Sequence, residues 1–595
     1  MTQVSLILSP EQAADRQTIQ KAVARQLQLP SEAVLAWRIT KRSVDARQRD
    51  IKVLLTIQAF LSPDESQLPP YPAPVYQNVS NAPREVLIVG AGPAGLFAAL
   101  TLIERGIRPI IIERGKQVSE RKVDIACLNK NEGIHPESNY CFGEGGAGTF
   151  SDGKLFSRSK KRGNMQRVME IFHYHGADDA ILYEAHAHIG SDKLPGVIRH
   201  MRETILNSGG EIHFGEKLTA LHHEADRIIA TTLGTQGEQT YSLPLSGPHR
   251  GAIILAIGHS AHDTYRMLAS SGVRLEPKGF ALGVRIEHPQ HLIDDLMYHR
   301  SPLRAKGLLP AANYALVTQV KNAYGQRGAY SFCMCPGGHI VPAGSTTHSG
   351  VVNGMSASRR NSPFANSGMV VELHPEDMVA DNSAAKRPSE SAANHPLESA
   401  ANHPSESEAK RSSKSAANHL SESEAKRLSK SAANHLSEST IMALQCLDWQ
   451  EKVENSSWKN GAFAAGQPES AIAPAQRMRD FVEGRPSRDL PVCSYLPGCI
   501  PSRLDQWLPQ VVSLALRQAF RDFDKKYPGF LTNDAVILGV ESRSSSPVRI
   551  PRDPTTMQHP DYPGLYPAGE GAGYAGGITS SALDGINAAN RIAES

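Results

Sequence analysis

Val86-Leu-Ile-Val-Gly-Ala-Gly-Pro-Ala-Gly95 is the stretch that decides the fold of this 595-residue chain. Its four leading apolar residues predict a buried parallel strand, and the apolar run from Ala94 to Ile103 predicts the helix that follows. Between them, Gly90, Gly92 and Gly95 form a G-x-G-x-x-G turn. In such a turn the glycines permit a tight bend, a close approach of the backbone to a pyrophosphate, and close packing of the helix on the strand. The stretch therefore predicts a dinucleotide-binding unit.

A second strand is predicted from Ile110 to Ile112, and it is followed by the charged pair Glu113 and Arg114. Glu113 lies 23 positions after Gly90, where an acid in this kind of unit holds the ribose 2′-hydroxyl. The pyrophosphate is expected at the N-terminus of the helix, whose free N–H groups point outward. The predicted cofactor-binding residues of this unit are Gly90, Gly92, Pro93, Ala94, Gly95, Glu113 and Arg114.

A second glycine cluster, CFGEGGAGTFSDGKL, spans residues 141–155. Its glycines expose backbone N–H groups and allow a flat ring or a phosphate to come close. We expect Gly145 and Gly146 to contact the cofactor and Lys154 to place a cation beside it. The run from Gly251 onward predicts a buried strand that ends in a turn at Gly258 and returns the chain to the dinucleotide-binding unit.

The third glycine cluster lies near the C-terminus, where residues 564–585 read GLYPAGEGAGYAGGITSSALDG. A short strand is expected over 565–568, a turn at Gly569, and a helix from Ile578 onward, preceded by Gly577. The N-terminus of this helix would direct donors at the edge of a flavin ring, and Glu570 would contact the ribityl or pyrophosphate part. Together with the first motif, this cluster predicts that the dinucleotide is FAD.

The residues that would act on a substrate are less defined. Cys333 and Cys335, in YSFCMCPGGH (330–339), are one residue apart, and both a redox pair and two ordinary buried thiols remain open. The catalytic candidates are His259, Lys154, His339, Cys333 and Cys335, with Glu144 and His262 also considered. Arg285, Arg359, Arg360 and Arg543 are candidates for holding an anionic substrate, because arginine binds carboxylates bidentately.

The expected fold class is α/β, with a Rossmann-like FAD-binding domain, a discontinuous α+β substrate domain and a small N-terminal βαββ module. In that module, strands are predicted near residues 3–8, 34–44 and 50–60, with one helix from Ser9 to Leu27. The predicted division is 1–75 for this module, 84–160 for the first part of the FAD-binding domain, 161–250 for a mixed region, 251–262 for the return strand, 263–380 for the substrate domain, 381–440 for an insertion, 441–545 for the rest of the substrate domain and 546–595 for the C-terminal part of the FAD-binding domain.

The insertion is expected to be disordered and removable. Ala-Ala-Asn-His recurs from residues 392, 400, 416 and 432, and few apolar residues separate the repeats. The regular spacing of its histidines follows from duplication, so no metal site is predicted.

Composition excludes several classes of function. The formal net charge is +3, which gives no global reason to expect a nucleic-acid partner. A signal-like N-terminus and an apolar run of about 18 residues are both absent from the sequence, so no membrane partner is predicted. Seven scattered cysteines suit a reducing compartment, and we expect a cytoplasmic protein.

These motifs resemble a family of largely uncharacterised FAD-dependent dehydrogenases, predicted NAD(FAD)-utilising dehydrogenases of the glutathione-reductase-type flavoprotein superfamily. The resemblance implies non-covalent FAD, held at Gly90, Gly92, Gly95, Glu113, Gly569, Glu570 and Ile578, and it supplies no substrate. The matching stretches are VGAGPAGLFAAL (89–100), FGEGGAGTFSDGKL (142–155), HIGSDKL (188–194), YSFCMCPGGHIVPA (330–343), VNGMSASRRNSPFANS (352–367) and GLYPAGEGAGYAGGITSSALDGI (564–586).

The sequence thus predicts an FAD-dependent oxidoreductase of the dehydrogenase type, which exchanges a hydride between a small organic substrate and the flavin. A second strand–GxGxxG–helix unit is missing, so NAD(P)H is expected at most as a transient reductant. The alternatives are an NAD(P)H-driven flavin reductase or monooxygenase, and a non-catalytic FAD-binding sensor or scaffold.

Overall fold

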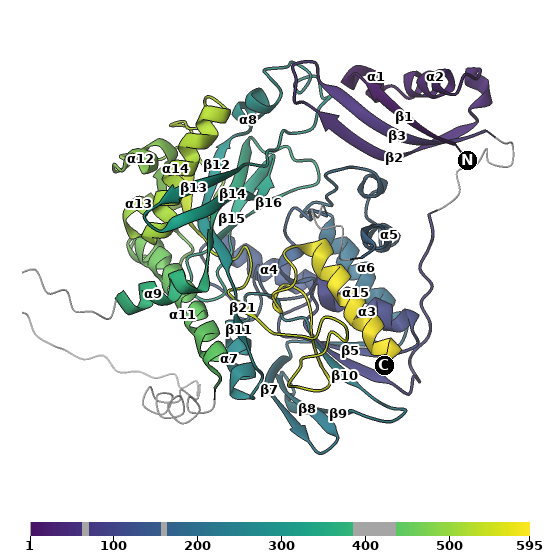
Figure 1. Ribbon diagram of the computed structural model, residues 1–595, viewed down its shortest axis with the longest axis vertical. Helices are drawn as coiled ribbons and strands as arrows, with labels where there is room; N and C mark the ends of the chain where they lie inside the picture. The colour runs from purple at the N-terminus through teal and green to yellow at the C-terminus, as the bar shows by residue number, and fades with distance from the viewer. Residues whose placement is uncertain (1, 62–70, 156–162, 385–435) are drawn as a thin grey trace, which may run out of the picture.

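The computed structural model describes residues 2–61, 71–155, 163–384 and 436–595 (Figure 1). Most of the predicted insertion, including its repeated histidines, lies outside the described residues.

A five-stranded parallel sheet forms the base of the molecule, and its strand order is β22-β10-β4-β5-β6. Four of its strands were expected from the sequence, and the α/β fold built on a parallel sheet is confirmed. The short strand β6 pairs with β5 and extends this sheet by one strand that the sequence patterns did not indicate. The strands are β4 (Glu85–Val89), β5 (Arg108–Glu113), β6 (Glu211–Phe214), β10 (Ala252–Leu255) and β22 (Leu565–Pro567).

Both faces of this sheet are covered, which explains why its strands are apolar throughout. Successive residues of β4 enter different cores: Val86 and Ile88 pack with the helices on one face, and Leu87 and Val89 pack with the layer on the other. The first face carries α3 (Pro93–Glu104), α5 (Met165–Tyr174), α6 (Leu194–Asn207) and α15 (Ile578–Glu594). The second carries α7 (His262–Ser270) and the antiparallel strands β7 (Lys217–Glu224), β8 (Arg227–Gly234) and β9 (Gly237–Pro244).

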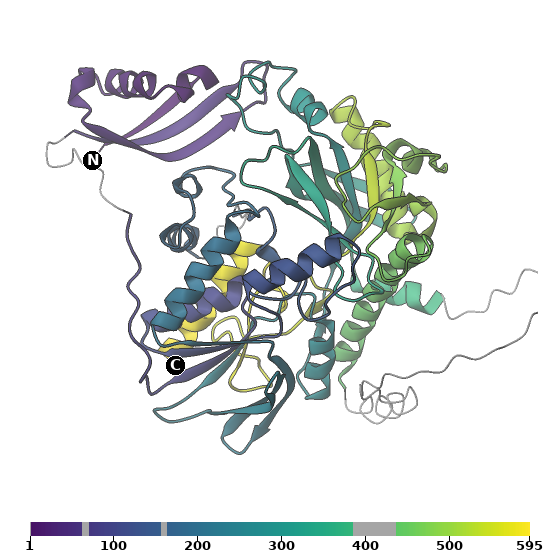
Figure 2. The ribbon, with the colours of Figure 1, turned by 180° about the vertical axis from the view of Figure 1, so that it is seen from behind.

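The helices α3 and α15 lie side by side although nearly the whole chain separates them in sequence (Figures 1 and 2). Gly585 permits this contact, because a Cβ at this position would overlap the carbonyl oxygen of Ala94. Each helix begins next to a glycine, at Gly92 and Gly577. Their N-termini are therefore brought to the same region of the molecule.

A seven-stranded sheet of order β13-β14-β17-β12-β20-β18-β19 forms the second layer system. Its apolar side packs on α14 and neighbouring helices around Phe481, Phe520 and Trp449. The strands are β12 (Phe280–Pro289), β13 (Val317–Asn322), β14 (Gly325–Cys335), β17 (Phe364–Leu373), β18 (Ala473–Arg477), β19 (Cys499–Pro501) and β20 (Val536–Glu541). The helices around it are α8 (Gln290–Met297), α12 (Met478–Glu483), α13 (Leu504–Trp507) and α14 (Gln510–Lys526).

The long helix α11 (Glu438–Trp458) connects the two layer systems. Its residues Ala443 and Leu447 enter the core below the parallel sheet, and Trp449 enters the core of the seven-stranded sheet. The helix α9 (Pro375–Ala384) packs against it, and the Trp449 indole donates a hydrogen bond to Asp381 at 2.7 Å. The remaining elements are α4 (Val118–Asn129), β11 (Glu276–Pro277), β15 (Gly338–Pro342), β16 (Val352–Ser356) and β21 (Val548–Arg549).

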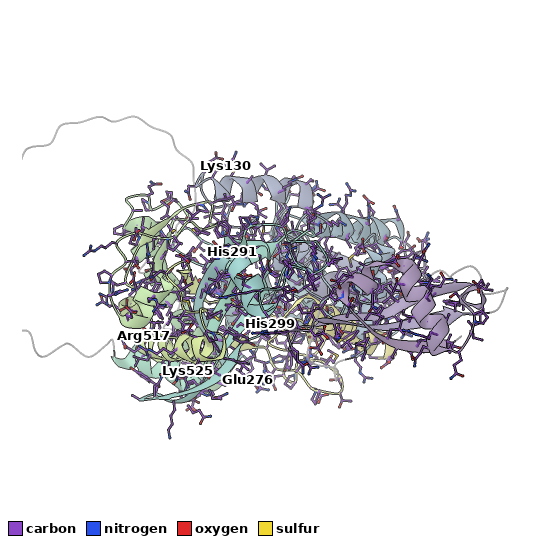
Figure 3. The ribbon with its side chains drawn as sticks, turned by 90° about the horizontal axis from the view of Figure 1, so that it is seen from above. Lys130, Glu276, His291, His299, Arg517 and Lys525 are labelled. Atoms are coloured by element: carbon purple, nitrogen blue, oxygen red, sulfur yellow. The ribbon has the colours of Figure 1, made fainter. Side chains whose placement is uncertain are left out.

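The N-terminal strands form a separate three-stranded antiparallel sheet of order β1-β3-β2. It consists of β1 (Thr2–Leu8), α1 (Pro10–Ala14), α2 (Arg16–Gln26), β2 (Ala36–Asp45) and β3 (Lys52–Phe60). The prediction of one helix was wrong, because Asp15 is extended and its carboxylate caps α2 through the N–H groups of Gln17 and Thr18. Seen from above, this module lies at the opposite end from α14, where Arg517 and Lys525 are labelled (Figure 3).

In the part of the chain that the structure describes, no helix is both long and apolar enough to cross a membrane.

Replacing Gly585 by alanine is expected to lower the free energy of unfolding by about 1–3 kcal/mol, because the new methyl group must push α15 away from α3. Gly196, in α6, is the matched control: a Cβ there would meet no atom within 4 Å. Alanine at that position should leave stability unchanged or raise it by up to about 1 kcal/mol through helix propensity. Urea unfolding of both variants measures the difference, and equal effects would refute the packing role of Gly585.

Candidate functional site

The glycines of the β4–α3 turn serve two different purposes. A Cβ at Gly95 would overlap the carbonyl oxygen of Gly90, so this glycine lets the helix pack on the turn. A Cβ at Gly92 would meet only the Cα of Gly146, at 3.8 Å, and the backbone of Gly92 is extended, a conformation open to every residue. Gly92 therefore borders open space rather than a packed neighbour.

Glu113, at the end of β5, is nearly fully buried and is bonded to three loops at once. Its carboxylate accepts hydrogen bonds from the N–H groups of Ala91 at 2.9 Å, Gly115 at 2.9 Å and Gly143 at 3.0 Å. It also lines the cavity described below, as the ribose-binding prediction requires. The loop-fixing contacts are an additional role that its spacing from Gly90 did not indicate.

Arg121, on α4, is the most important residue of the site that the sequence motifs did not indicate. Its guanidinium is fully buried and donates hydrogen bonds to the carbonyl oxygens of residues 139, 140, 143 and 144 at 2.7–3.2 Å. Burial lowers the pKa of Arg121 to about 10. Hydrogen bonds from one cation on the neighbouring helix α4 therefore hold the glycine-rich loop in its conformation. Many sequences place an arginine in a helix before a glycine-rich loop, so this pattern alone does not predict that the guanidinium binds the carbonyl groups of the loop.

The three glycine clusters meet around one cavity of about 530 Å³, a size typical of ligand sites. Of the predicted cofactor residues, those that line it are Gly90, Gly92, Pro93, Ala94, Glu113, Arg114, Gly146, Gly258, Gly569, Glu570, Gly577 and Ile578. Gly95 and Gly145 do not line it. At Gly145 the space of a side chain is already taken by Thr149 and Ile198, so this glycine serves the loop itself.

Two helix N-termini point their unpaired N–H groups and positive dipole ends toward the cavity. Pro93 and Ala94 at the start of α3 line it, and so do residues 577–581 at the start of α15. A Cβ at Gly576 would meet no atom within 4 Å, and the buried Ser260 hydroxyl, also in the lining, has no hydrogen-bond partner within the described part of the chain. These features fit a large anionic ligand with several hydrogen-bonding groups.

At the carboxyl end of β10, His259 lies in the cavity wall beside Glu570, with Nδ1 2.8 Å from Oε2. His262 is directed elsewhere and pairs with Glu451 at 2.9 Å. His339 is exposed on β15 and does not line the cavity. Of the three histidines that were candidates for a catalytic acid or base, only His259 therefore lines the cavity.

Another part of the cavity wall is formed by residues 330–333 of β14, with Lys154 and Asn353. Lys154 Nζ lies 2.9 Å from Asp152 and within reach of both Cys333 and Cys335. Burial alone would lower the pKa of Lys154, but the two sulfurs and Asp152 outweigh it and raise the pKa. Cys333 lines the cavity and Cys335 lies behind it.

The arginines that were candidates for an anionic substrate are mostly committed to carboxylates. Arg285 pairs with Glu541 at 3.1 Å, Arg360 with Asp152 at 2.8 Å and Arg543 with Glu454 at 2.8 Å. Arg543 is the one of these that lines the cavity, and Arg359 is exposed. The structure therefore offers no unpaired arginine at the cavity among these four described candidates.

The chain is 34% identical to an uncharacterised protein of Clostridium beijerinckii, and the alignment covers 98% of this chain and 96% of that protein. The chain belongs to the family of that protein. Its residues 84–244 match the FAD binding domain, residues 279–445 and 433–544 match the C-terminal domain-like region of FAD-dependent proteins, and residues 1–60 match a domain of unknown function. The β4–α3 glycine turn that borders the cavity lies within the residues that match the FAD binding domain, and the cavity lining fits FAD. This family member is an FAD-dependent oxidoreductase.

Solved structures show only distant likeness. CtdE in complex with FAD aligns over 86% of this chain and 84% of its own, with 10% identity and a TM-score of 0.29. OxyS anhydrotetracycline hydroxylase from Streptomyces rimosus aligns over 49% and 45%, with 15% identity and a TM-score of 0.21. A flavoprotein/dehydrogenase from Cytophaga hutchinsonii aligns over 50% and 57%, with 13% identity and a TM-score of 0.23. At this level, likeness decides neither reaction nor substrate.

Replacing Gly92 by valine should leave the protein folded but abolish FAD retention, because the side chain would occupy the open space beside the α3 N-terminus. Gly95→Ala is the contrasting control, since its Cβ overlaps backbone and should destabilise the fold itself. Absorbance of the purified proteins measures bound flavin, and thermal unfolding measures stability. A Gly92→Val protein that keeps one FAD per chain would disprove the assignment of this turn.

Arg121→Met should lower the free energy of unfolding by about 2–4 kcal/mol, because four buried carbonyl groups each lose a hydrogen bond from the guanidinium. The loop that follows should also hold FAD less tightly. Arg199→Met, on the exposed surface of α6, is the control and should change stability by less than about 0.5 kcal/mol. Urea unfolding and FAD titration check both effects, and an unchanged unfolding midpoint for Arg121→Met would contradict this role.

Proposed function

We propose that this oxidoreductase is of the dehydrogenase type, in the glutathione-reductase-type superfamily, and exchanges a hydride between a small organic molecule and FAD. One observation carries the proposal: the two helix N-termini and residues 330–333 of β14 line the same cavity, so cofactor and substrate can share one space. When bound, FAD supplies the ring that takes up or releases the electron pair. The chain's own residues supply position and charge.

At the cofactor end, the proposed contacts are with the backbone. The N–H groups at the starts of α3 and α15 would hold the pyrophosphate and the polar edge of the ring, because both helix dipoles favour negative charge there. Glu113 and Arg121 fix the loops between which the cofactor would lie. These residues bind and orient, and none of them needs to change its protonation.

At the substrate end, three side chains can act on a small molecule. Lys154 places a positive charge in the wall, and Asn353 offers its amide N–H donors, since its Oδ1 already accepts from Arg285 and from the Gly354 N–H. His259 is the proposed group for holding or moving a proton, since Glu570 fixes its ring by the bond at Nδ1. Because most nearby arginines are ion-paired, a neutral or weakly charged substrate suits this end better than a carboxylate.

The described part of the chain contains a single strand–GxGxxG–helix unit, the β4–α3 turn. A nicotinamide nucleotide would therefore have to reach FAD through the shared cavity rather than from a domain of its own. This arrangement favours a flavin that is reduced by the substrate itself.

The test is an anaerobic absorbance spectrum of the purified flavoprotein, recorded before and after addition of NADH or NADPH and then of small-molecule substrates. The flavin is expected to stay oxidised with either nucleotide and to bleach with a specific metabolite, and His259→Ala should slow that bleaching without releasing FAD. Rapid bleaching by NADPH, with peroxide release in air, would replace the proposal by a nicotinamide-driven reductase or monooxygenase. A flavin that no metabolite reduces would indicate a sensor or scaffold.

A further inference from the structure

Cys333 occupies an irregular point of β14 that turns its side chain to the cavity. The pairing of β14 with β17 shifts register between Phe332 and Cys335, which marks a bulge. Within it, Cys333 has a φ of 49°, a conformation uncommon for a residue with a side chain. Bulges of this kind occur beside active sites and re-aim single side chains. Cys333 lines the cavity, whereas Cys335 is fully buried behind it.

Two cations converge on the two sulfurs. Lys154 Nζ lies 3.7 Å from Cys333 Sγ and 3.1 Å from Cys335 Sγ. Arg285 donates to Cys335 Sγ at 3.4 Å and to the Cys333 carbonyl oxygen at 2.8 Å. Two carboxylates oppose these cations: Glu541 pairs with Arg285 at 3.1 Å and raises the pKa of Cys333, and Asp152 pairs with Lys154 at 2.9 Å. An ordinary buried thiol is surrounded by apolar groups and attracts no such arrangement.

The surroundings of the two cysteines favour different protonation states of their thiols. The pKa of Cys333 lies well below its ordinary value, at about 5, because the neighbouring Cys335 side chain favours its thiolate and Lys154 and Arg285 add positive charge. Burial and the neighbouring Cys333 side chain raise the pKa of Cys335, whose thiol donates to the Cys333 carbonyl oxygen at 3.3 Å. The accessible sulfur is therefore a thiolate at neutral pH, and the buried sulfur keeps its proton.

We propose that Cys333 and Cys335 are a thiol–disulfide exchange pair and that the cavity admits a low-molecular-weight disulfide as their substrate. Cys333 Sγ attacks one sulfur of the disulfide, which forms a mixed disulfide and expels the other half as a thiolate. Cys335 Sγ then loses its proton and attacks Cys333 Sγ, which releases the second half and closes a Cys333–Cys335 disulfide. In total, the incoming disulfide takes two electrons from the cysteine pair and leaves as two thiols, which take one proton from Cys335 and one from water.

This activity goes beyond the proposed hydride exchange and does not depend on it. The exchange is complete within the protein and the disulfide, so it can be measured in a single turnover. Return to the thiolate–thiol pair takes two electrons and one proton, and two electrons are the amount that an FAD-dependent oxidoreductase handles in each cycle.

A second pair of cysteines provides an internal comparison. The Sγ atoms of Cys493 and Cys499 lie 3.7 Å apart, and the hydrogen bond between them, together with burial, raises the pKa of Cys499. Neither of these residues lines the cavity. This pair is close enough to form a disulfide, so the test uses a Cys493→Ser background.

The test uses the reduced, FAD-loaded full chain, anaerobically, with bis(2-hydroxyethyl) disulfide as the probe. Released thiols are counted, and the peptide that contains residues 333–335 is weighed by mass spectrometry. The parent should release two thiols per chain, and its peptide should lose two hydrogens. Cys335→Ser should release one thiol and retain half of the probe on Cys333, and Cys333→Ser should leave this peptide unmodified. Flavin absorbance of each variant confirms that the site is intact.

The pH dependence of the first step tests the role of the cations. With a pKa of about 5 for Cys333, the rate should change by less than about twofold between pH 6 and pH 8, whereas an ordinary thiol would accelerate by about 80-fold. Lys154→Met should move the midpoint upward by about 1–3 pH units, because it removes an opposite charge beside the thiolate.

Three results would overturn the proposal: a 333–335 peptide that stays reduced in the parent, a Cys333→Ser protein that reacts as fast as the parent, or a rate that follows an ordinary thiol. None of them bears on whether a metabolite reduces the flavin. Conversely, failure to find such a metabolite leaves the exchange reaction untouched, so the two proposals fail independently.

Discussion

The close approach of α3 to α15 is the contact on which the rest of the structure depends. It joins the first glycine turn to the last one and thereby places two helix N-termini at one cavity. Gly585 allows the contact by leaving room for the Ala94 carbonyl oxygen. The strands between these helices add part of the wall, because β10 pairs with both β4 and β22 and the turn that follows β10 carries His259. A site built from both ends of the chain exists only when the whole parallel sheet has formed.

Buried charges shape the remaining walls. Glu113 and Arg121 use several backbone partners each, which offsets the cost of removing a charge from water. Arg285 with Glu541, and Arg543 with Glu454, place ion pairs inside the second layer system where apolar packing would serve stability equally well. Both arginines instead end beside a cysteine sulfur, Arg285 at Cys335 and Arg543 at Cys141. These pairs are therefore better explained by the chemistry of the cavity than by stability.

Local sequence patterns predicted much of the cofactor end and little of the substrate end. The turn at Gly90–Gly95 and the helix from Ile578 follow from neighbouring residues, because glycine spacing and apolar runs act within one strand–turn–helix unit. Arg121 bonds to a loop 18–23 positions further along the chain, and the cations around Cys333 come from segments far from it in sequence, so no pattern within one strand–turn–helix unit predicts either contact. The break at Asp15 was missed for the opposite reason: its side chain caps a new helix within a run that otherwise favours one helix.

Lys154 lines the cavity and also contacts both sulfurs of the cysteine pair, so its charge acts on both. Around the sulfurs, the cations Lys154, Arg285 and Arg360 face the carboxylates of Asp152 and Glu541 and the thiolate of Cys333, three charges against three when each is ionised. Closing a disulfide removes the thiolate and leaves one cation unbalanced beside the cavity. An excess positive charge in a poorly solvated wall favours negative charge on whatever lies next to it. The oxidation state of the cysteine pair would thus set the electrostatic field at the site where the proposed hydride exchange takes place, so the two activities would influence one another even without sharing electrons.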